Sequence, residues 1–474
     1  MKVYCFSTSL CASVFIAALL QAEAIQAPRN SKISGLLQRE NELGIPRGGK
    51  VILGKKPEEA PKVSGGSASV PNEIFNLVKS IVGAGVLGLP AGIAAFGTSG
   101  EALIPNVALI LGIGTLSAYG FSLVGRICAY TDATSYREAW EKSVSSKSGW
   151  MPALACFLVT IGSVLAYSMI LSDTIPQLLK AFTGIVITRT QALLSLTTFV
   201  LLPLCLMKDL SSLGPFSLLG IIGMAWVTLA MTIRFFDGTY APGGKFYEQL
   251  APEFIPSFEK MGLMDMVTNP NIFLVVSMLA TAFMAHYNAP KFYWELENNT
   301  LSRFNLVVVV SFAISCLLFV GISSLGFATF GKASAGLILN NYSTDDMLMS
   351  LSRVAVAVSL IFSYPLGFVG VRDGLLDLMQ VEKEKRTNKL LDVLTVGLLA
   401  MVTGLAFVVK DLGKVLALAG STWGNCLVYL FPTYMFIRLS KSRPELQGEV
   451  PQAVMTAVIG LFMGVIGTVM AIKK

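Results

Sequence analysis

Three small residues in succession, Gly83, Ala84 and Gly85, lie within an apolar stretch long enough to cross a bilayer. Each glycine lowers helix propensity by about 1 kcal/mol relative to alanine. Pro90 follows and has no backbone N–H group. The pattern predicts a helix that is broken inside the membrane, where freed amide groups could bind an anionic group of a small molecule. The other interpretation is close packing of helices through small residues.

A second apolar stretch has the same character. Ala282, Phe283 and Ala285 precede His286 and Pro290 in a run that contains polar residues deep within it. Carbonyl groups around the first three residues could accept hydrogen bonds from a cation. His286 is the only histidine of the chain, and an imidazole could exchange a proton near neutral pH. It could equally be a neutral hydrogen-bonding residue.

Long apolar segments must position these two stretches. The 474-residue chain is 54% hydrophobic and only 14% charged, and its mean hydropathy is +0.66, which is typical of a multi-spanning membrane protein. We expect an all-α fold, because the apolar runs are too long for strands. Eleven segments are long enough to span a bilayer: about 73–96, 102–126, 151–179, 190–207, 212–236, 270–290, 304–330, 347–370, 389–409, 413–437 and 451–472.

Several classes of function are not expected. The net charge is +7, but the basic residues are dispersed over short loops and the N-terminal tail, so no nucleic-acid surface is predicted. The phosphate-binding pattern GxxxxGK[ST] is absent, and so are Ser-His-Asp, metal-ligand and paired-carboxylate arrangements. We therefore expect no enzyme, no cofactor and no metal site.

The N-terminal region precedes the membrane domain, which we place at 72–474. Residues 1–24 combine an apolar run with a small-x-small sequence at 22–24, as in a signal peptide. An uncleaved short hydrophobic anchor is the alternative. Residues 25–71 carry eight Lys and Arg against four Glu, which predicts a disordered basic tail or a transit-type targeting segment. The basic excess places this tail on the cytosol-equivalent side. A plastid envelope is one hypothesis for the location, and a vacuolar, other internal or plasma membrane is the alternative.

The loop after the second segment contains one further regular pattern. Tyr136, Trp140 and Val144 are spaced four residues apart. This spacing puts them on one face of a helix, which predicts a short amphipathic helix on the membrane surface. An ordinary loop is the alternative.

The first stretch also carries a recognisable motif. Residues Phe75 to Pro90 follow the order F-N-L-x-K-x-x-x-G-x-G-x-L-x-L-P, which resembles the first membrane helix of the amino acid/auxin permease family. Further matches cover the chain to about residue 440: Leu202-Pro203-Leu204 with 210–213, residues 282–296, residues 326–331, and Pro365 with Arg372. The resemblance implies a LeuT-like fold, in which two inverted repeats of five helices are part of an eleven-helix protein.

The resemblance further implies a transporter of amino acids. A zwitterionic substrate would place its carboxylate on the amides of Gly83, Ala84 and Gly85. Its ammonium would lie against the carbonyls of the second break, because an inverted repeat makes the two breaks face each other.

Other family positions extend this site. Tyr167 corresponds to a tyrosine that closes over the substrate carboxylate, although simple aromatic packing is an alternative. Lys79 matches proton-coupled relatives, whereas sodium-coupled relatives tend to have an amide there; its ammonium could also extend to the membrane interface. Ser359 and Ser363 correspond to hydroxyls that sodium-dependent relatives offer to the ion.

The resulting prediction is a secondary active amino acid transporter that is coupled to protons rather than sodium. It would work by alternating access around its two broken helices. The alternatives are sodium coupling, or an amino-acid-sensing membrane protein that binds its ligand without transporting it.

Overall fold

The computed structural model describes residues 66–207 and 216–473. The predicted signal peptide and most of the predicted tail lie outside these ranges, as do residues 210–213 of the family pattern. Within them, ten helical segments are long and apolar enough to cross a membrane, and one bent pair of helices makes an eleventh span. The predicted number of spans is therefore confirmed.

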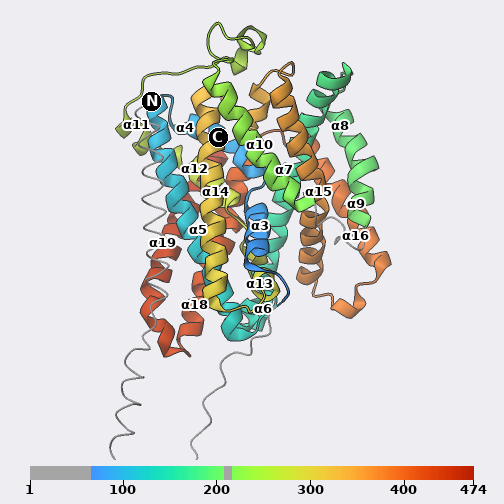
Figure 1. Cartoon of the computed structure of the whole chain (residues 1–474). Coiled ribbons are helices and arrows are strands. Elements are labelled where there is room, and N and C mark those ends of the chain that lie inside the picture. The colour runs from blue at the N-terminus through green and yellow to red at the C-terminus, as the bar shows by residue number, and fades with distance from the viewer. Residues whose placement is uncertain (1–65, 208–215, 474) are drawn as a thin grey trace, which may run out of the picture.

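The first five spans form the N-terminal half of the bundle (Figure 1). They consist of α3 (Val70–Ile81) with α4 (Leu89–Phe96), α5 (Leu103–Thr131), α7 (Trp150–Thr183), α8 (Arg189–Leu196) with α9 (Leu202–Leu206), and α10 (Phe216–Phe236).

The remaining six spans follow an extended loop that contains α11 (Leu263–Thr268). They are α12 (Ile272–Ala282) with α13 (Ala289–Glu295), α14 (Leu301–Phe330), α15 (Met347–Leu378), α16 (Asn388–Val408), α17 (Leu412–Ala419) with α18 (Phe431–Ser440), and α19 (Val450–Lys473).

Polar caps start several of these helices where the chain enters an apolar run. Thr188 caps α8 in a reciprocal pair with Gln191, while Thr300 and Thr387 accept backbone N–H groups at the starts of α14 and α16. Each such bond satisfies an amide that has no acceptor within its own helix. The boundaries therefore follow from local sequence.

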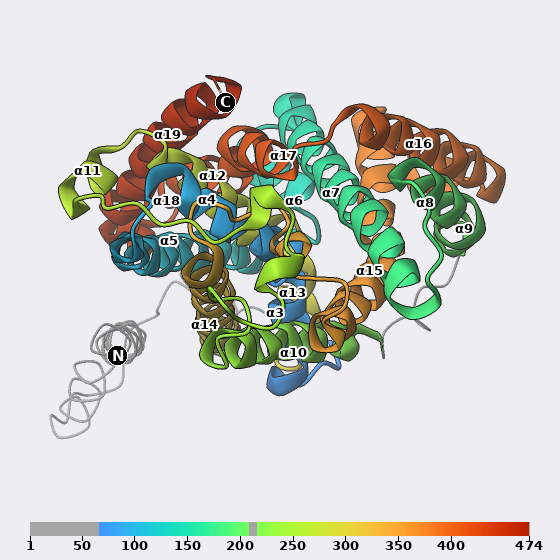
Figure 2. The same ribbon diagram turned by 90° about the horizontal axis from the view of Figure 1, so that it is seen from above.

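The two broken spans occupy the middle of the bundle (Figure 2). Viewed along the bundle, α3, α4, α12 and α13 lie centrally, while α16 with α8 and α9 is at one edge and α19 is toward the other. The helices α7 and α15 pack extensively against each other, and α10 packs on α15 and α14. This arrangement surrounds the breaks with protein, which is where unwound backbone is tolerated at membrane depth.

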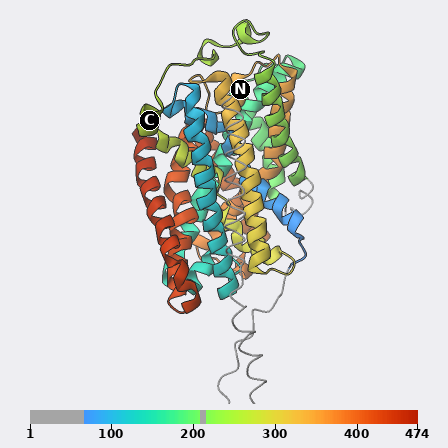
Figure 3. The same cartoon turned by 60° about the vertical axis from the view of Figure 1, so that its left-hand side comes forward.

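The bundle has two distinct ends (Figures 1 and 3). We call the end where α3 begins the tail side, and the end that carries α11 the far side. At the far side, the fully buried carboxylate of Asp346 accepts two hydrogen bonds from Arg234, at 2.8 and 2.7 Å, and one from the Tyr240 hydroxyl at 3.0 Å. This cluster fixes the end of α10 to the start of α15.

The loop at 132–149 forms the predicted amphipathic helix, α6 (Tyr136–Ser143). Its apolar face does not lie on the membrane surface, however. Tyr136 and Trp140 are buried: the Tyr136 hydroxyl donates to the Leu427 carbonyl at 2.9 Å, and Trp140 packs against Phe431 at 5.0 Å between ring centroids. The prediction was wrong in this respect, because the same apolar spacing suits packing against α18.

Candidate binding site between two broken helices

The first span is broken where the sequence predicts it. Val82 has φ −80° and ψ 75°, and Gly83 has φ −102° and ψ −162°, so both leave the helical region. The chain continues as a 3-10 turn at Ala84–Gly88 before α4, and the two halves of the span are bent by 42°. The first amides of the new turn have no acceptor one turn back, so they can donate to a ligand. Pro90 fits the first turn of α4 because its missing N–H is not needed there.

The second span is broken at the corresponding place. Helix α12 ends at Ala282, and Phe283 and Ala285 have φ/ψ of −85°/4° and −128°/5°. A 3-10 turn at His286–Asn288 leads into α13. The helical ladder is therefore interrupted, and carbonyl groups near the end of α12 lose the N–H donors that an intact helix would supply.

The two breaks face each other. A side chain built on Gly85 would lie 3.5 Å from Cα and 3.6 Å from Cβ of Ala282. In addition, the Asn288 side-chain amide donates to the Ser80 hydroxyl at 3.4 Å. Small residues at 85 and 282 thus let the two unwound segments approach within van der Waals contact.

A small cavity of about 20 Å³ opens beside the first break. That volume holds roughly one water molecule, so an amino acid would require the helices to separate. Five of the predicted site residues line this cavity: Lys79, Gly83, Tyr167, Ser359 and Ser363. The structure therefore brings together residues from three spans that are far apart in sequence.

Tyr167 approaches the break from α7. A side chain on Gly83 would lie 3.5 Å from the Tyr167 hydroxyl oxygen. The hydroxyl is thus close to the amides of the unwound segment, where it could donate to the same anionic group. Glycine at 83 keeps this space open.

Lys79 and Ser359 converge on the other side of the cavity. A side chain on Gly220 of α10 would lie 2.7 Å from Ser359 Oγ and 3.7 Å from Lys79 Cε. Lys79 also belongs to the last turn of α3, where the carbonyl ends of the helix favour a positive charge. The extended side chain therefore reaches into the protein rather than to the membrane interface.

His286 lies away from this cavity. It is fully buried, and its Nε2 is 2.9 Å from the Ser117 carbonyl oxygen. Because a carbonyl only accepts, Nε2 carries the proton in this contact. The ring packs edge-on against Phe121 at 5.5 Å and Phe312 at 6.4 Å. These surroundings suit a neutral imidazole.

The residues of the second break are also buried beside the cavity rather than in its lining. Ala282 faces Gly85, and Ala285 is fully buried. The Phe283 ring packs against Phe319 at 4.7 Å and Phe312 at 6.0 Å.

Sequence reasoning missed half of the lining. These residues are apolar and come from four helices or turns, and nothing in their local sequence distinguishes them from core positions: Val82, Leu87, Met224, Val356 and Leu360.

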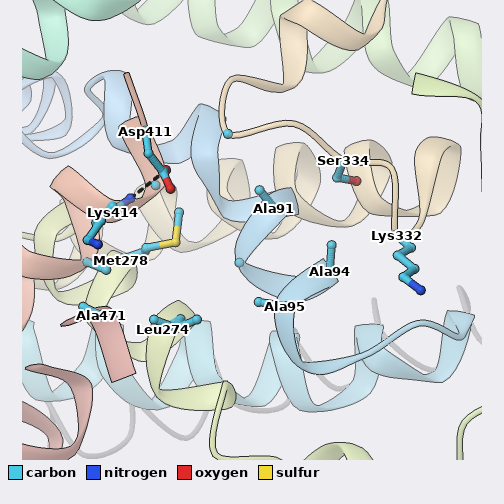
Figure 4. A pocket seen from close by; sticks show the side chains of 14 residues that line it. Ala91, Ala94, Ala95, Leu274, Met278, Lys332, Ser334, Asp411, Lys414 and Ala471 are labelled. Carbon is cyan, nitrogen blue, oxygen red and sulfur yellow. Dashed lines mark hydrogen bonds between the residues drawn. The ribbon is translucent and has the colours of Figure 1, made fainter. Parts of the chain in front are cut away.

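A larger cavity of about 350 Å³ lies toward the far side, between α4, α12 and α17 (Figure 4). Asp411, Lys414 and Lys332 contribute charged groups to its wall. Nearby, a side chain added at Gly88 would come within 3.1 Å of both Leu416 and Met278, and Met278 lines this cavity. Leu87, the preceding residue, lines the smaller cavity.

Comparison with known proteins agrees with this architecture. A family model described as transmembrane amino acid transporter protein matches residues 66–473. Vacuolar amino acid transporter 2 of Saccharomyces cerevisiae is 24% identical and aligns with 81% of this chain and 79% of its own length. Human sodium-coupled neutral amino acid transporter 7 is also 24% identical, over 80% of this chain and 81% of its own.

A solved structure shows the same fold at low sequence similarity. MHP1, a nucleobase-cation-symport-1 family transporter in a closed conformation with bromovinylhydantoin bound, superposes with a TM-score of 0.53. The alignment covers 88% of this chain and 95% of MHP1 at 10% identity. The expected LeuT-like fold is confirmed.

Proposed function

This chain belongs to the transmembrane amino acid transporter protein family, and we propose that it moves zwitterionic amino acids through a site at its two broken spans. It is a secondary active transporter and not an enzyme. One observation carries the proposed site: the cavity beside Gly83 is lined by residues from α3, α7 and α15 together.

The substrate carboxylate would bind at the first break. The Gly83 amide donates to the Ile81 carbonyl at 2.8 Å, so the amides of Ala84 and Gly85 are the candidate donors, and the Tyr167 hydroxyl lies near Gly83. Donors fixed around a carboxylate make short, charge-assisted hydrogen bonds.

The substrate ammonium would bind at the second break. Carbonyl groups of Ala282, Phe283 and Ala285 are the candidate acceptors, since the helix is interrupted there. The contact between Gly85 and Ala282 supports a single site for both charges. The apolar lining from Met224 and Leu360 favours a neutral side chain on the substrate.

Protons are the proposed coupling ion. Lys79 lines the same cavity as Ser359 and Ser363, and its Cε lies near Gly220 as the Ser359 hydroxyl does. A cation at this position repels a second cation such as sodium, which would use the same hydroxyls. Proton transfer to and from Lys79 would change the charge of the site without a bound metal ion.

The other candidate groups have lesser roles in this proposal. Sodium coupling remains the competing assignment, because Ser359 and Ser363 offer two hydroxyl ligands and several relatives are named as sodium-coupled. His286 acts as a neutral structural residue, since it hydrogen-bonds to the Ser117 carbonyl among aromatic rings.

The transporter is a multi-pass membrane protein, and we propose the plastid envelope as its location. The basis is the combination of a signal-like segment at 1–24 with a basic tail at 25–71. A relative named as vacuolar makes the vacuolar membrane the main competitor. Fusion of residues 1–71 to a fluorescent reporter tests this, and a purely secretory or vacuolar signal would overturn it.

Transport by the purified protein tests the remaining points. Uptake of labelled neutral amino acids into proteoliposomes is measured with an imposed proton gradient, an imposed sodium gradient, or neither. We expect accumulation with the proton gradient and no effect of replacing sodium by potassium. Accumulation that needs sodium alone would overturn the ion assignment. Binding without flux would overturn transport and favour a sensing role.

A further inference from the structure

Glu73 is a buried acid that the proposed transport site does not use. It lies in the first turn of α3, and its side chain is fully buried. Among residues 66–207 and 216–473, no hydrogen-bond donor reaches either of its carboxylate oxygens. An ionised carboxylate without a partner is strongly disfavoured in such a position. Burial without a partner therefore favours the neutral carboxyl group in this conformation.

A short strap, residues 66–68, ties this end of α3 to the end of α13. The Gly66 amide donates to the Trp294 carbonyl and the Ala68 amide to the Glu295 carbonyl, both at 3.0 Å. The Glu297 amide returns a bond to the Ala68 carbonyl at 2.8 Å. A side chain on Gly66 would lie 2.3 Å from the Glu295 carbonyl oxygen, so only glycine permits this approach. The tail-side ends of the two broken spans are thus held together.

Two charged groups of α13 act on the Glu73 carboxyl in the described part of the chain. Glu295 repels a negative charge there, and Lys291 attracts it. These two residues pair with each other at 3.8 Å and are about half exposed or more, so Lys291 is already partly neutralised. Helix α14 contacts α3 through a neutral group, the Ser311 hydroxyl, which donates to the Ile74 carbonyl at 3.3 Å. Ionisation of Glu73 in place is therefore opposed by burial and by Glu295.

We propose that Glu73 is a proton-binding site that latches the tail-side end of α3. With the proton bound, the neutral carboxyl group stays buried and α3 remains against α13 and α14. When the proton leaves, the carboxylate gains free energy by entering water, so α3 and the strap swing away from α14. Low pH on the tail side closes this end of the pathway, and high pH opens it. The inference rests on the proposed function only in taking α3 as a helix that moves, and it does not require proton coupling.

A cysteine reporter tests the latch directly. Ser311 is fully buried behind α3, so Ser311→Cys reacts with a membrane-impermeant thiol reagent from the tail side only when α3 opens. The protein without this substitution provides the background from its own cysteines. Because the thiolate is the reacting form and its fraction rises with pH, each rate is corrected for the thiolate fraction. The corrected labelling rate should rise with tail-side pH, by at most about tenfold per pH unit for one proton. Adding Glu73→Gln should hold the corrected rate at its low-pH value throughout.

Two further variants keep the test decisive. Glu297→Gln changes an exposed carboxylate beside the strap and should leave the pH profile unchanged. If Glu73→Gln does not fold, Glu73→Asp should still titrate, with a shifted midpoint. A flat profile in the parent, or an unchanged profile in Glu73→Gln, would overturn the latch. Because labelling needs no substrate, a protein that labels as expected but does not accumulate amino acids would refute the proposed function and not the latch.

Discussion

Substitution of Gly83 by alanine separates a binding role of the first break from a packing role. Gly83 has an extended backbone conformation that alanine adopts readily. The new methyl group would lie 3.5 Å from the Tyr167 hydroxyl oxygen, which is an ordinary contact. The protein should therefore fold normally, with a methyl group filling much of a cavity that holds roughly one water.

The expected loss follows from the hydrogen bonds that the methyl group displaces. A carboxylate would have to sit within about 2.7 Å of the Tyr167 hydroxyl oxygen, and the methyl group takes that space. One hydrogen bond to a charged group contributes about 1.5–3 kcal/mol, which corresponds to about a ten- to hundredfold loss in kcat/KM. Tyr167→Phe removes the hydroxyl that would donate to the substrate carboxylate, and it should lower kcat/KM by a similar factor.

Initial rates of uptake into proteoliposomes measure the loss in kcat/KM. The thermal unfolding midpoint shows whether the variant folds normally. Gly397→Ala is the matched control, because Gly397 is exposed on α16 and an added side chain there meets nothing within 4 Å. It should leave transport unchanged.

The double variant completes the test. If Gly83 and Tyr167 act on one carboxylate, the combined loss should be smaller than the product of the two single losses. Wild-type kcat/KM in Gly83→Ala, or losses that simply multiply, would refute the assignment of this break to the carboxylate.

Three other substitutions have distinct expected outcomes. Lys79→Gln should abolish stimulation of uptake by a proton gradient while leaving exchange of substrate between the two sides, as measured in the same vesicles. Asp346→Asn should lower the free energy of unfolding by roughly 3 kcal/mol, because the buried carboxylate and its charge-assisted hydrogen bonds from Arg234 are lost. Asp237→Asn, at the more exposed side of the same arginine, should cost less than about 1 kcal/mol. His286→Phe should cost about 1 kcal/mol of stability and leave the pH dependence of transport unchanged; a changed pH profile would indicate that His286 carries protons.

The sequence determined the membrane spans and the position of both breaks. The length of an apolar segment decides whether it can cross a bilayer. Glycine and proline change the backbone conformation at their own positions, so Gly83, Pro90 and Pro290 predicted the helix breaks from local sequence alone. The distribution of caps such as Thr300 follows from the same short-range effects.

Only the tertiary structure decided which side chains meet. The rotation of each helix about its axis is set by packing against neighbours, and no single segment encodes it. Lys79 could have extended to the interface, yet it lines the same cavity as Ser359, and both side chains lie within 4 Å of the space that Gly220 leaves open. The residue type of His286 allowed a proton carrier or a neutral hydrogen-bonding residue, and its packing against phenylalanines supports the second role. Glu73 carried no signal in the sequence, because its lack of partners depends on the strap and α13 folding over it.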